Sequence, residues 1–141
     1  MIGIIICGHG HFASGLTSAL QLIMGEQENY IAVDFPKGDT NTELERNISQ
    51  AVEQLGDSES ILVMSDLLSG SPFNTAIMLA MKKPNIHVIY GTNLGMLIET
   101  VMKRNNQASI EDLIETAVST GKQQIGIFEL PGDTEEDPFD E

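Results

Sequence analysis

Two short polar segments of the chain carry the side chains best suited to chemistry. His9 lies between two glycines in segment 8–12 (Gly-His-Gly-His-Phe), and Asp66 opens segment 66–71 (Asp-Leu-Leu-Ser-Gly-Ser). A carboxylate that accepts the proton of one imidazole nitrogen fixes the tautomer and leaves the other nitrogen as a nucleophile. We therefore interpret His9 as a candidate nucleophile and Asp66 as the group that orients its ring.

The second segment runs into a predicted helix. Ser71 followed by Pro72 predicts an N-cap and a proline at the first helical position. The free backbone N–H groups and the dipole at such a helix start attract anions. A nucleophilic imidazole, an orienting carboxylate and an anion pocket together favour a site that accepts and releases a phosphoryl group. This chemistry requires no metal, and the three histidines and one cysteine are not at the spacing of zinc ligands.

Plainer interpretations of the same residues stay open at this point. A histidine after a strand is commonly a simple loop residue, and Asp66 could instead cap a helix or be the phosphoacceptor of a receiver-like domain. A receiver would need acidic residues after the first strand to hold Mg²⁺, where this chain has histidines. A dinucleotide fingerprint would need glycine where Ala13 stands. His87 and Cys7, both in apolar strands, are expected to be structural.

Alternating strand and helix patterns must bring the two polar segments together. Apolar, β-branched runs predict strands at 2–7, 30–35, 60–65 and 87–90. Helical periodicity predicts helices at 13–24, 42–55, 71–83, 94–104 and 109–120, the last one stopped by Gly121. A fifth strand or an extended arm is predicted at 124–130.

Strands that alternate with helices imply parallel pairing through right-handed crossovers. We expect an α/β fold with a small doubly wound, mostly parallel sheet in the strand order 2-1-3-4. Ligands bind such sheets beyond the carboxyl ends of the strands, where the strand order reverses. That crevice lies between the first and third strands, so we expect His9 and Asp66 to meet there.

Composition and charge exclude several function classes. The chain has 141 residues, of which 41% are hydrophobic, which fits one folded domain, and its single cysteine excludes an internal disulfide. No apolar run approaches the roughly 18 residues of a membrane span. Residues 1–7 are too short and too uncharged for a signal peptide, so we expect the cytoplasm. The formal charge of −14 argues against binding to nucleic acid or anionic lipid.

The negative charge is unevenly distributed. Residues 129–141 hold seven of the 21 acidic residues and no basic one, which leaves 14 acidic and seven basic residues, or −7, in 1–128. We expect a domain at 1–130 and an acidic, disordered tail at 131–141, with partner docking as the alternative role of the tail. An acidic domain should attract basic surfaces of partner proteins with a salt-dependent association rate.

Four blocks of the sequence carry a resemblance to a known family. They are 4–10, 24–29, 66–74 and 91–97, and the third contains Gly-Ser-Pro-Phe-Asn downstream of Asp66. Over essentially residues 1–128 the chain resembles the IIA component of the mannose family of sugar phosphotransferase systems. Its variant Gly-His-Gly-His-Phe-Ala-Ser-Gly resembles branches that handle amino sugars such as N-acetylgalactosamine.

The resemblance implies a role for each residue of the site. His9 would be the phosphorylated histidine, modified on the Nε2 (tele) nitrogen, and Asp66 would be hydrogen-bonded to its ring. His11 stands where family members commonly carry an aromatic residue, and with Phe12 it would shape the pocket or the docking surface. The phosphate pocket would be lined by Gly8, Gly10, Ser69, Gly70 and Ser71.

The resemblance also implies partners but no cofactor. The phosphoryl group would come from the phosphocarrier HPr and pass to a IIB component, which phosphorylates a sugar entering through the IIC and IID membrane components. The chain would form a homodimer whose last strand, antiparallel to its neighbour, is exchanged between subunits, and we expect no fused IIB domain. Two other functions stay open, namely a IIA-like phosphoacceptor of a dihydroxyacetone kinase system and a regulatory phospho-binding module that does not relay.

Overall fold

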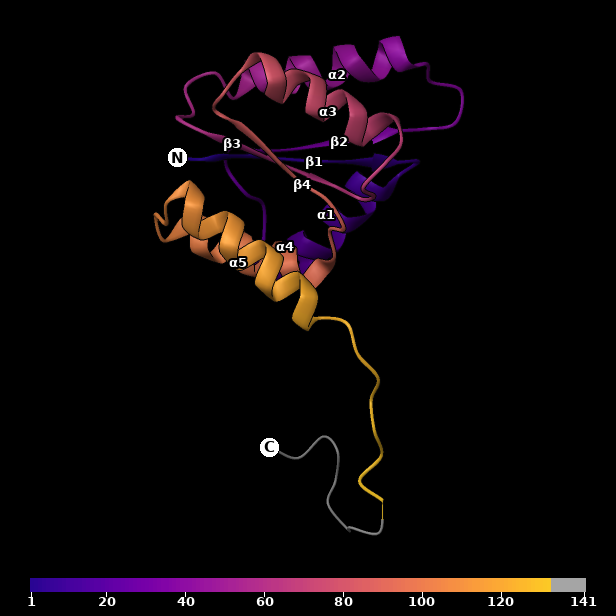
Figure 1. The fold of residues 1–141 in the computed structure, drawn as a ribbon, viewed down its shortest axis with the longest axis vertical. Helices are drawn as coiled ribbons and strands as arrows, with labels where there is room; N and C mark the ends of the chain where they lie inside the picture. The colour runs from indigo at the N-terminus through magenta and orange to yellow at the C-terminus, as the bar shows by residue number, and fades with distance from the viewer. Residues whose placement is uncertain (133–141) are drawn as a thin grey trace.

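The computed structural model describes residues 1–132, in which strands and helices alternate as the sequence patterns predict. The strands form one all-parallel sheet in the order β2-β1-β3-β4, which confirms the predicted order. Helices α2 and α3 cover one face of this sheet, and α1, α4 and α5 cover the other (Figure 1). The elements are β1 (Gly3–His9), α1 (Phe12–Met24), β2 (Tyr30–Phe35), α2 (Asn41–Gln54), β3 (Ile61–Ser65), α3 (Ser71–Lys82), β4 (Ile86–Ile89), α4 (Leu94–Asn105) and α5 (Ile110–Gln123).

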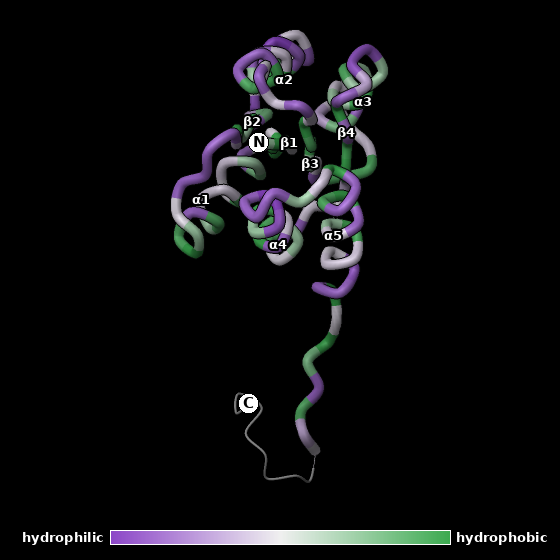
Figure 2. Tube along the Cα trace, turned by 90° about the vertical axis from the view of Figure 1, so that its left-hand side faces the viewer, coloured by the Kyte–Doolittle hydropathy of each residue, from purple (hydrophilic) through white to green (hydrophobic). Residues whose placement is uncertain are grey.

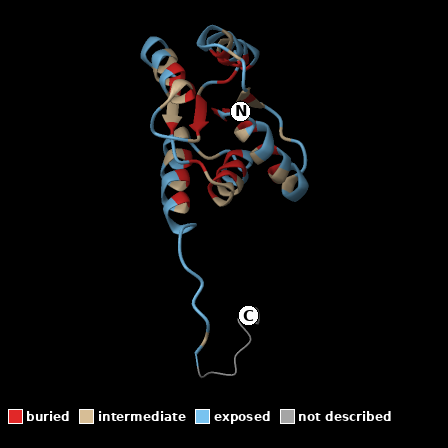
Figure 3. Cartoon of the chain, turned by 90° about the vertical axis from the view of Figure 1, so that its right-hand side faces the viewer, coloured by how far each residue is buried: buried red, intermediate tan, exposed pale blue. Residues whose placement is uncertain are grey.

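The central strands β1 and β3 are buried on both faces. In β1, Ile4 and Ile6 pack toward α1, α4 and α5, whereas Ile5 and Cys7 pack toward α2 and α3, and all four are 0% exposed. Burial on both sides is why these strands read as unbroken apolar runs and not as an alternation. Figure 2 shows the hydrophobic stretches in the sheet, and Figure 3 shows buried residues on the sheet and on the helix faces turned toward it.

Strand β1 runs two residues beyond its predicted end. Gly8 and His9 keep the parallel register with β2, opposite Asp34 and Phe35. His9 therefore ends a strand and does not lie in a loop. Its backbone is held by the sheet, which gives the imidazole a rigid base.

The start of α3 differs from the prediction by one residue. Gly70, not Ser71, is the N-cap, and its carbonyl oxygen accepts the Asn74 N–H at 2.9 Å. Ser71 and Pro72 are the first two helical residues. A proline is accommodated there because the first N–H groups of a helix have no intrahelical partner.

The prediction that Gly121 ends the last helix is wrong, because α5 continues to Gln123. A Cβ on Gly121 would lie 2.9 Å from the sulfur of Met96, and the Gly121 carbonyl accepts a hydrogen bond from Asn93 Nδ2 at 3.1 Å. Glycine at this position serves the close packing of α5 on α4, and that packing sustains the helix.

Residues 124–130 form an extended arm that leaves the end of α5 (Figure 1). The alternative of a fifth strand is not found within the described chain. Apolar residues recur along the arm (Figure 2), and Ile125, Ile127 and Leu130 are 79%, 85% and 79% exposed. The acidic tail predicted at 131–141 lies, from residue 133 on, outside the described residues. None of the described helices is long and apolar enough to cross a membrane.

Candidate active site

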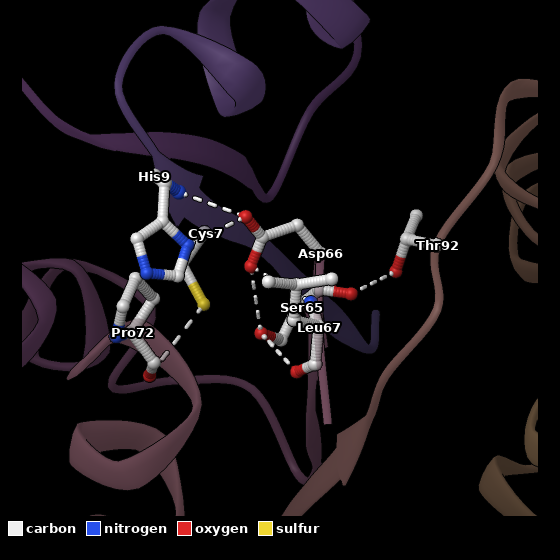
Figure 4. Close-up of polar contacts among 7 residues, drawn as sticks. All are labelled: Cys7, His9, Ser65, Asp66, Leu67, Pro72 and Thr92. Atoms are coloured by element: carbon white, nitrogen blue, oxygen red, sulfur yellow. Dashed lines mark hydrogen bonds and ion pairs between the residues drawn. The ribbon is translucent and has the colours of Figure 1, made fainter. Parts of the chain in front are cut away.

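His9 and Asp66 lie together at the carboxyl edge of the sheet, where β1 and β3 end (Figure 4). Nδ1 of His9 is 2.9 Å from Oδ2 of Asp66, and the backbone N–H of His9 donates to the same oxygen at 2.9 Å. A carboxylate can only accept, so Nδ1 carries the ring proton and Nε2 keeps a lone pair. The pair thus presents a nucleophilic nitrogen on the side of the ring away from Asp66.

The Asp66 carboxylate is held as an anion by its surroundings. Burial alone would raise its pKa, but the hydrogen bonds from the backbone and ring of His9 and from the Leu67 N–H outweigh that effect and lower the pKa. Oδ1 accepts from the Leu67 N–H at 2.8 Å and from the Ser65 hydroxyl at 3.4 Å. The Ser65 carbonyl is in turn anchored by the Thr92 hydroxyl at 2.8 Å. The side chain of Asp66 is 11% exposed and that of His9 is 45% exposed, so a partner can reach the ring but hardly the carboxylate.

The Nε2 edge of the ring lies directly against Gly70. A Cβ at this position would be 2.7 Å from Cε1 and 2.8 Å from Nε2 of His9, and the φ angle of Gly70 is +95°. Only glycine combines that backbone conformation with so close an approach. Gly70 therefore sets the nucleophilic nitrogen of His9 against the first turn of α3.

That first turn supplies free donors. In the part of the chain that the structure describes, the N–H groups of Ser71 and Phe73 donate no hydrogen bond, and Pro72 has no N–H. Unpaired N–H groups and the positive end of the helix dipole favour an anion at this position. A phosphoryl group on Nε2 of His9 would lie beside these donors.

The predicted glycines 8 and 10 flank His9 in the sequence, and their contacts support its scaffold. A Cβ on Gly8 would be 2.6 Å from the Phe12 ring and 3.0 Å from Cγ of Asp66, so the missing side chain lets both groups pack. The Gly10 N–H already donates to the Phe35 carbonyl at 2.8 Å, and the Phe35 N–H donates back at 3.0 Å. Ser69 is exposed in the loop before α3.

A second histidine–carboxylate pair flanks the first, and sequence reasoning missed its acidic member. Nδ1 of His11 is 3.2 Å from Oδ2 of Asp34, near the end of β2. Asp34 also accepts from the backbone N–H of Ser14 at 2.8 Å and from its hydroxyl at 2.6 Å. Burial would raise the pKa of Asp34, but the bonds from Ser14 and His11 lower it. The sequence signal that could have identified Asp34 is its position near the carboxyl end of a predicted strand, because a similar position identified Asp66.

The remaining candidates lie apart from this chemistry. Cys7 is 0% exposed, and burial raises the pKa of its thiol to about 12, so it stays protonated in the core. His87 lies on β4 opposite Leu62, two strands from β1. Among residues 1–132, no three His, Cys, Asp or Glu side chains gather where they could hold a metal ion.

Comparison with known proteins gives matches over nearly the whole described chain. The family model for the PTS system fructose IIA component, EIIA-man, matches residues 3–118. The mannose-specific EIIAB component of Escherichia coli (strain K12) is 34% identical over 124 residues, which are 88% of this chain and 38% of that protein. The chain therefore spans well under half the length of that relative.

Two further matches extend over most of both proteins. The fructose-specific EIIA component of Bacillus subtilis (strain 168) is 30% identical over 127 residues, which are 90% of this chain and 86% of that protein. The crystal structure of the phosphotransferase system component EIIA from Streptococcus agalactiae has a TM-score of 0.82 and 34% identity, and the match covers 90% of this chain and 97% of that chain.

Proposed function

The chain belongs to the mannose-type EIIA family of sugar phosphotransferase systems, and on that premise we propose that it relays a phosphoryl group from phospho-HPr, through His9, to a IIB component. The observation that carries this proposal is the pairing of His9 Nδ1 with Asp66 at 2.9 Å, with Nε2 set against the start of α3. The reaction takes place in the cytoplasm, where IIB passes the group to a sugar that enters through the IIC and IID components.

In the accepting step, the Nε2 lone pair of His9 attacks the phosphorus of phospho-HPr. The new N–P bond forms as the N–P bond of the donor breaks, and the imidazole of HPr leaves with the electron pair. Because Nδ1 keeps its proton, the His9 ring gains positive charge, which the Asp66 carboxylate balances at 2.9 Å. The phosphoryl group brings a charge of about −1.5 to −2, which the N–H groups at the start of α3 stabilise. Transfer to IIB reverses these steps.

Phosphorylation by purified components tests the proposal. With phosphoenolpyruvate, enzyme I and HPr, we expect one acid-labile phosphoryl group on the wild-type protein, none on His9→Ala, and the same final extent of labelling, one group per chain, on His11→Ala. Labelling that survives in His9→Ala and disappears in His11→Ala would overturn the assignment. A relay must also hand the label to a IIB partner, whereas a regulatory phospho-binding module would retain it.

We also propose that two copies of the chain pair through the arm, residues 124–130. Strand β4 is an edge of the sheet, and the arm holds out Ile125, Ile127 and Leu130, each more than three-quarters exposed. An antiparallel exchange of the arm onto the partner's β4 would bury these side chains and complete the edge.

Two truncations separate the arm from the acidic residues that follow it. Removing residues 125–141 should give a monomer by light scattering, whereas removing only 133–141 should leave a dimer. The same oligomeric state for the two truncated proteins would contradict a role for the arm in dimer formation.

A further inference from the structure

The pair formed by His11 and Asp34 takes no part in the phosphoryl path described above, yet its geometry is well defined. Asp34 can only accept, so Nδ1 of His11 carries the proton of the neutral ring and Nε2 keeps a lone pair. The side chain of His11 is 78% exposed. The protein thus presents a second imidazole nitrogen of fixed tautomer, open to whatever approaches His9.

The position of His11 is fixed by the contacts that its segment makes with β2. Asp34 binds both the His11 ring and the first turn of α1, through the N–H and hydroxyl of Ser14. The backbone of Gly10, between the two histidines, is bonded in both directions to Phe35. The Phe35 ring lies 6.4 Å, between centroids, from the His9 ring. Such preorganisation lowers the entropic cost of a contact made by His11.

His11 lies on one side of His9, and an apolar surface lies on the other. Leu67 and Leu68 follow β3 and are 55% and 59% exposed, whereas His11 is tied to β2, and β1 with His9 runs between these strands. A protein that brings a phosphorylated histidine to His9 Nε2 must approach between these two flanks. His11 is the polar flank of that approach.

We propose that His11 Nε2 accepts a hydrogen bond from a cationic side chain, Arg or Lys, that lies beside the phosphohistidine of the carrier protein. The chemistry favours a cation because the Asp34 carboxylate stands behind the ring and the chain carries a net charge of −14. This inference rests on the proposed relay function. It makes His11 a determinant of carrier binding, separate from the chemistry at His9.

Two phosphoryl donors of different size test this role, namely phospho-HPr and the small molecule phosphoramidate. For His11→Leu we expect the KM for phospho-HPr to rise about tenfold, the effect of losing one charge-assisted hydrogen bond, with kcat within about twofold. Phosphorylation by phosphoramidate should stay at the wild-type rate, because this donor makes no contact with the docking surface. His11→Gln, which restores an acceptor oxygen, should recover most of the loss.

His87→Leu is the matched control, because it removes an imidazole from β4 and should change neither reaction. Equal slowing of His11→Leu with both donors would show that His11 shapes the His9 site and would overturn the docking role. Unchanged kinetics of His11→Leu with phospho-HPr would overturn it as well. Failure of the wild-type protein to accept from phospho-HPr, with normal labelling by phosphoramidate, would instead contradict the relay function itself.

Discussion

The pairs His9–Asp66 and His11–Asp34 are built from the same two side chains but have different surroundings. In both, a carboxylate near the carboxyl end of a strand that neighbours β1 holds Nδ1, at 2.9 Å for His9 and 3.2 Å for His11. The free Nε2 of His9 lies against Gly70 at the start of α3, whereas His11 is directed into solvent, with 78% of its side chain exposed against 45% for His9.

The difference teaches that a histidine–carboxylate pair fixes a tautomer but does not by itself make a phosphorylation site. At His9 the nucleophilic nitrogen stands beside unpaired N–H groups that can bind phosphoryl oxygens. At the second pair, Asp34 accepts its other hydrogen bonds from Ser14 in the first turn of α1. The first pair is therefore suited to chemistry, and the second to holding the adjacent turn and meeting a partner.

The largest effect short of removing His9 is expected from Gly70→Ala. A Cβ would stand 2.8 Å from Nε2 and force the ring away from α3. Misplacement of a reacting atom by about 1 Å costs roughly 100-fold, and we expect that loss with phospho-HPr and with phosphoramidate. The matched control is Gly25→Ala, because Gly25 has a similar backbone (φ +79° and ψ −177°, against +95° and +172°) with nothing within 4 Å of its Cβ position.

Both alanine variants should lose about 1–3 kcal/mol of stability from backbone strain, measured by urea unfolding. Only Gly70→Ala should lose transfer activity. If Gly25→Ala slowed transfer as much as Gly70→Ala, the loss would reflect stability and not the contact with Nε2.

An intermediate effect is expected when the two carboxylates are removed in turn. Asp66→Ala should slow phosphorylation of His9 by about 10- to 100-fold without abolishing it, as happens when an orienting partner of a functional imidazole is lost. Asp34→Ala should leave labelling by phosphoramidate within a few-fold of wild type and lower the unfolding free energy by about 1 kcal/mol, because the first turn of α1 loses its acceptor. If phosphoramidate labelling slowed equally in Asp66→Ala and Asp34→Ala, Asp34 would support the chemistry at His9 as much as Asp66 does, which would contradict the distinction between the two pairs.

The smallest expected effect is a pH dependence of stability. Asp66 has a lowered pKa in the folded protein, so its stabilising contribution is fully present above the ordinary carboxyl pKa of about 4 and is lost as the pH falls through the lowered value. The unfolding free energies of wild type and Asp66→Asn should therefore differ most at pH 7 and converge toward pH 3. A constant difference across this range would show that Asp66 is not stabilised as an anion.

The sheet and the first pair could be predicted because their signals are local. Unbroken apolar runs mark the buried strands, and the parallel strand order places whatever follows β1 beside whatever follows β3. That rule predicts that His9 and Asp66 meet, and Nδ1 of His9 lies 2.9 Å from Oδ2 of Asp66. Function at the level of the family came from the four sequence blocks and not from the fold.

The features that the sequence did not predict depend on contacts between residues far apart in the chain. Asp34 belongs to an otherwise apolar strand, and only the register of β1 with β2, Gly8 opposite Asp34, brings it to His11. The N-cap falls on Gly70 because its backbone must pass against the His9 ring, which serine propensity at position 71 does not reveal. The apolar residues of the arm are compatible with a fifth strand or with an extended arm, and the described chain offers the arm no strand partner.

The most direct test of the central claim is to identify the phosphorylated nitrogen by NMR, using the ¹⁵N–³¹P coupling in ¹⁵N-labelled protein phosphorylated by phospho-HPr. We predict a single N–P bond, at Nε2 of His9, with Nδ1 still hydrogen-bonded to Asp66. A phosphoryl group on Nδ1 of His9, or on either nitrogen of His11, would contradict the account.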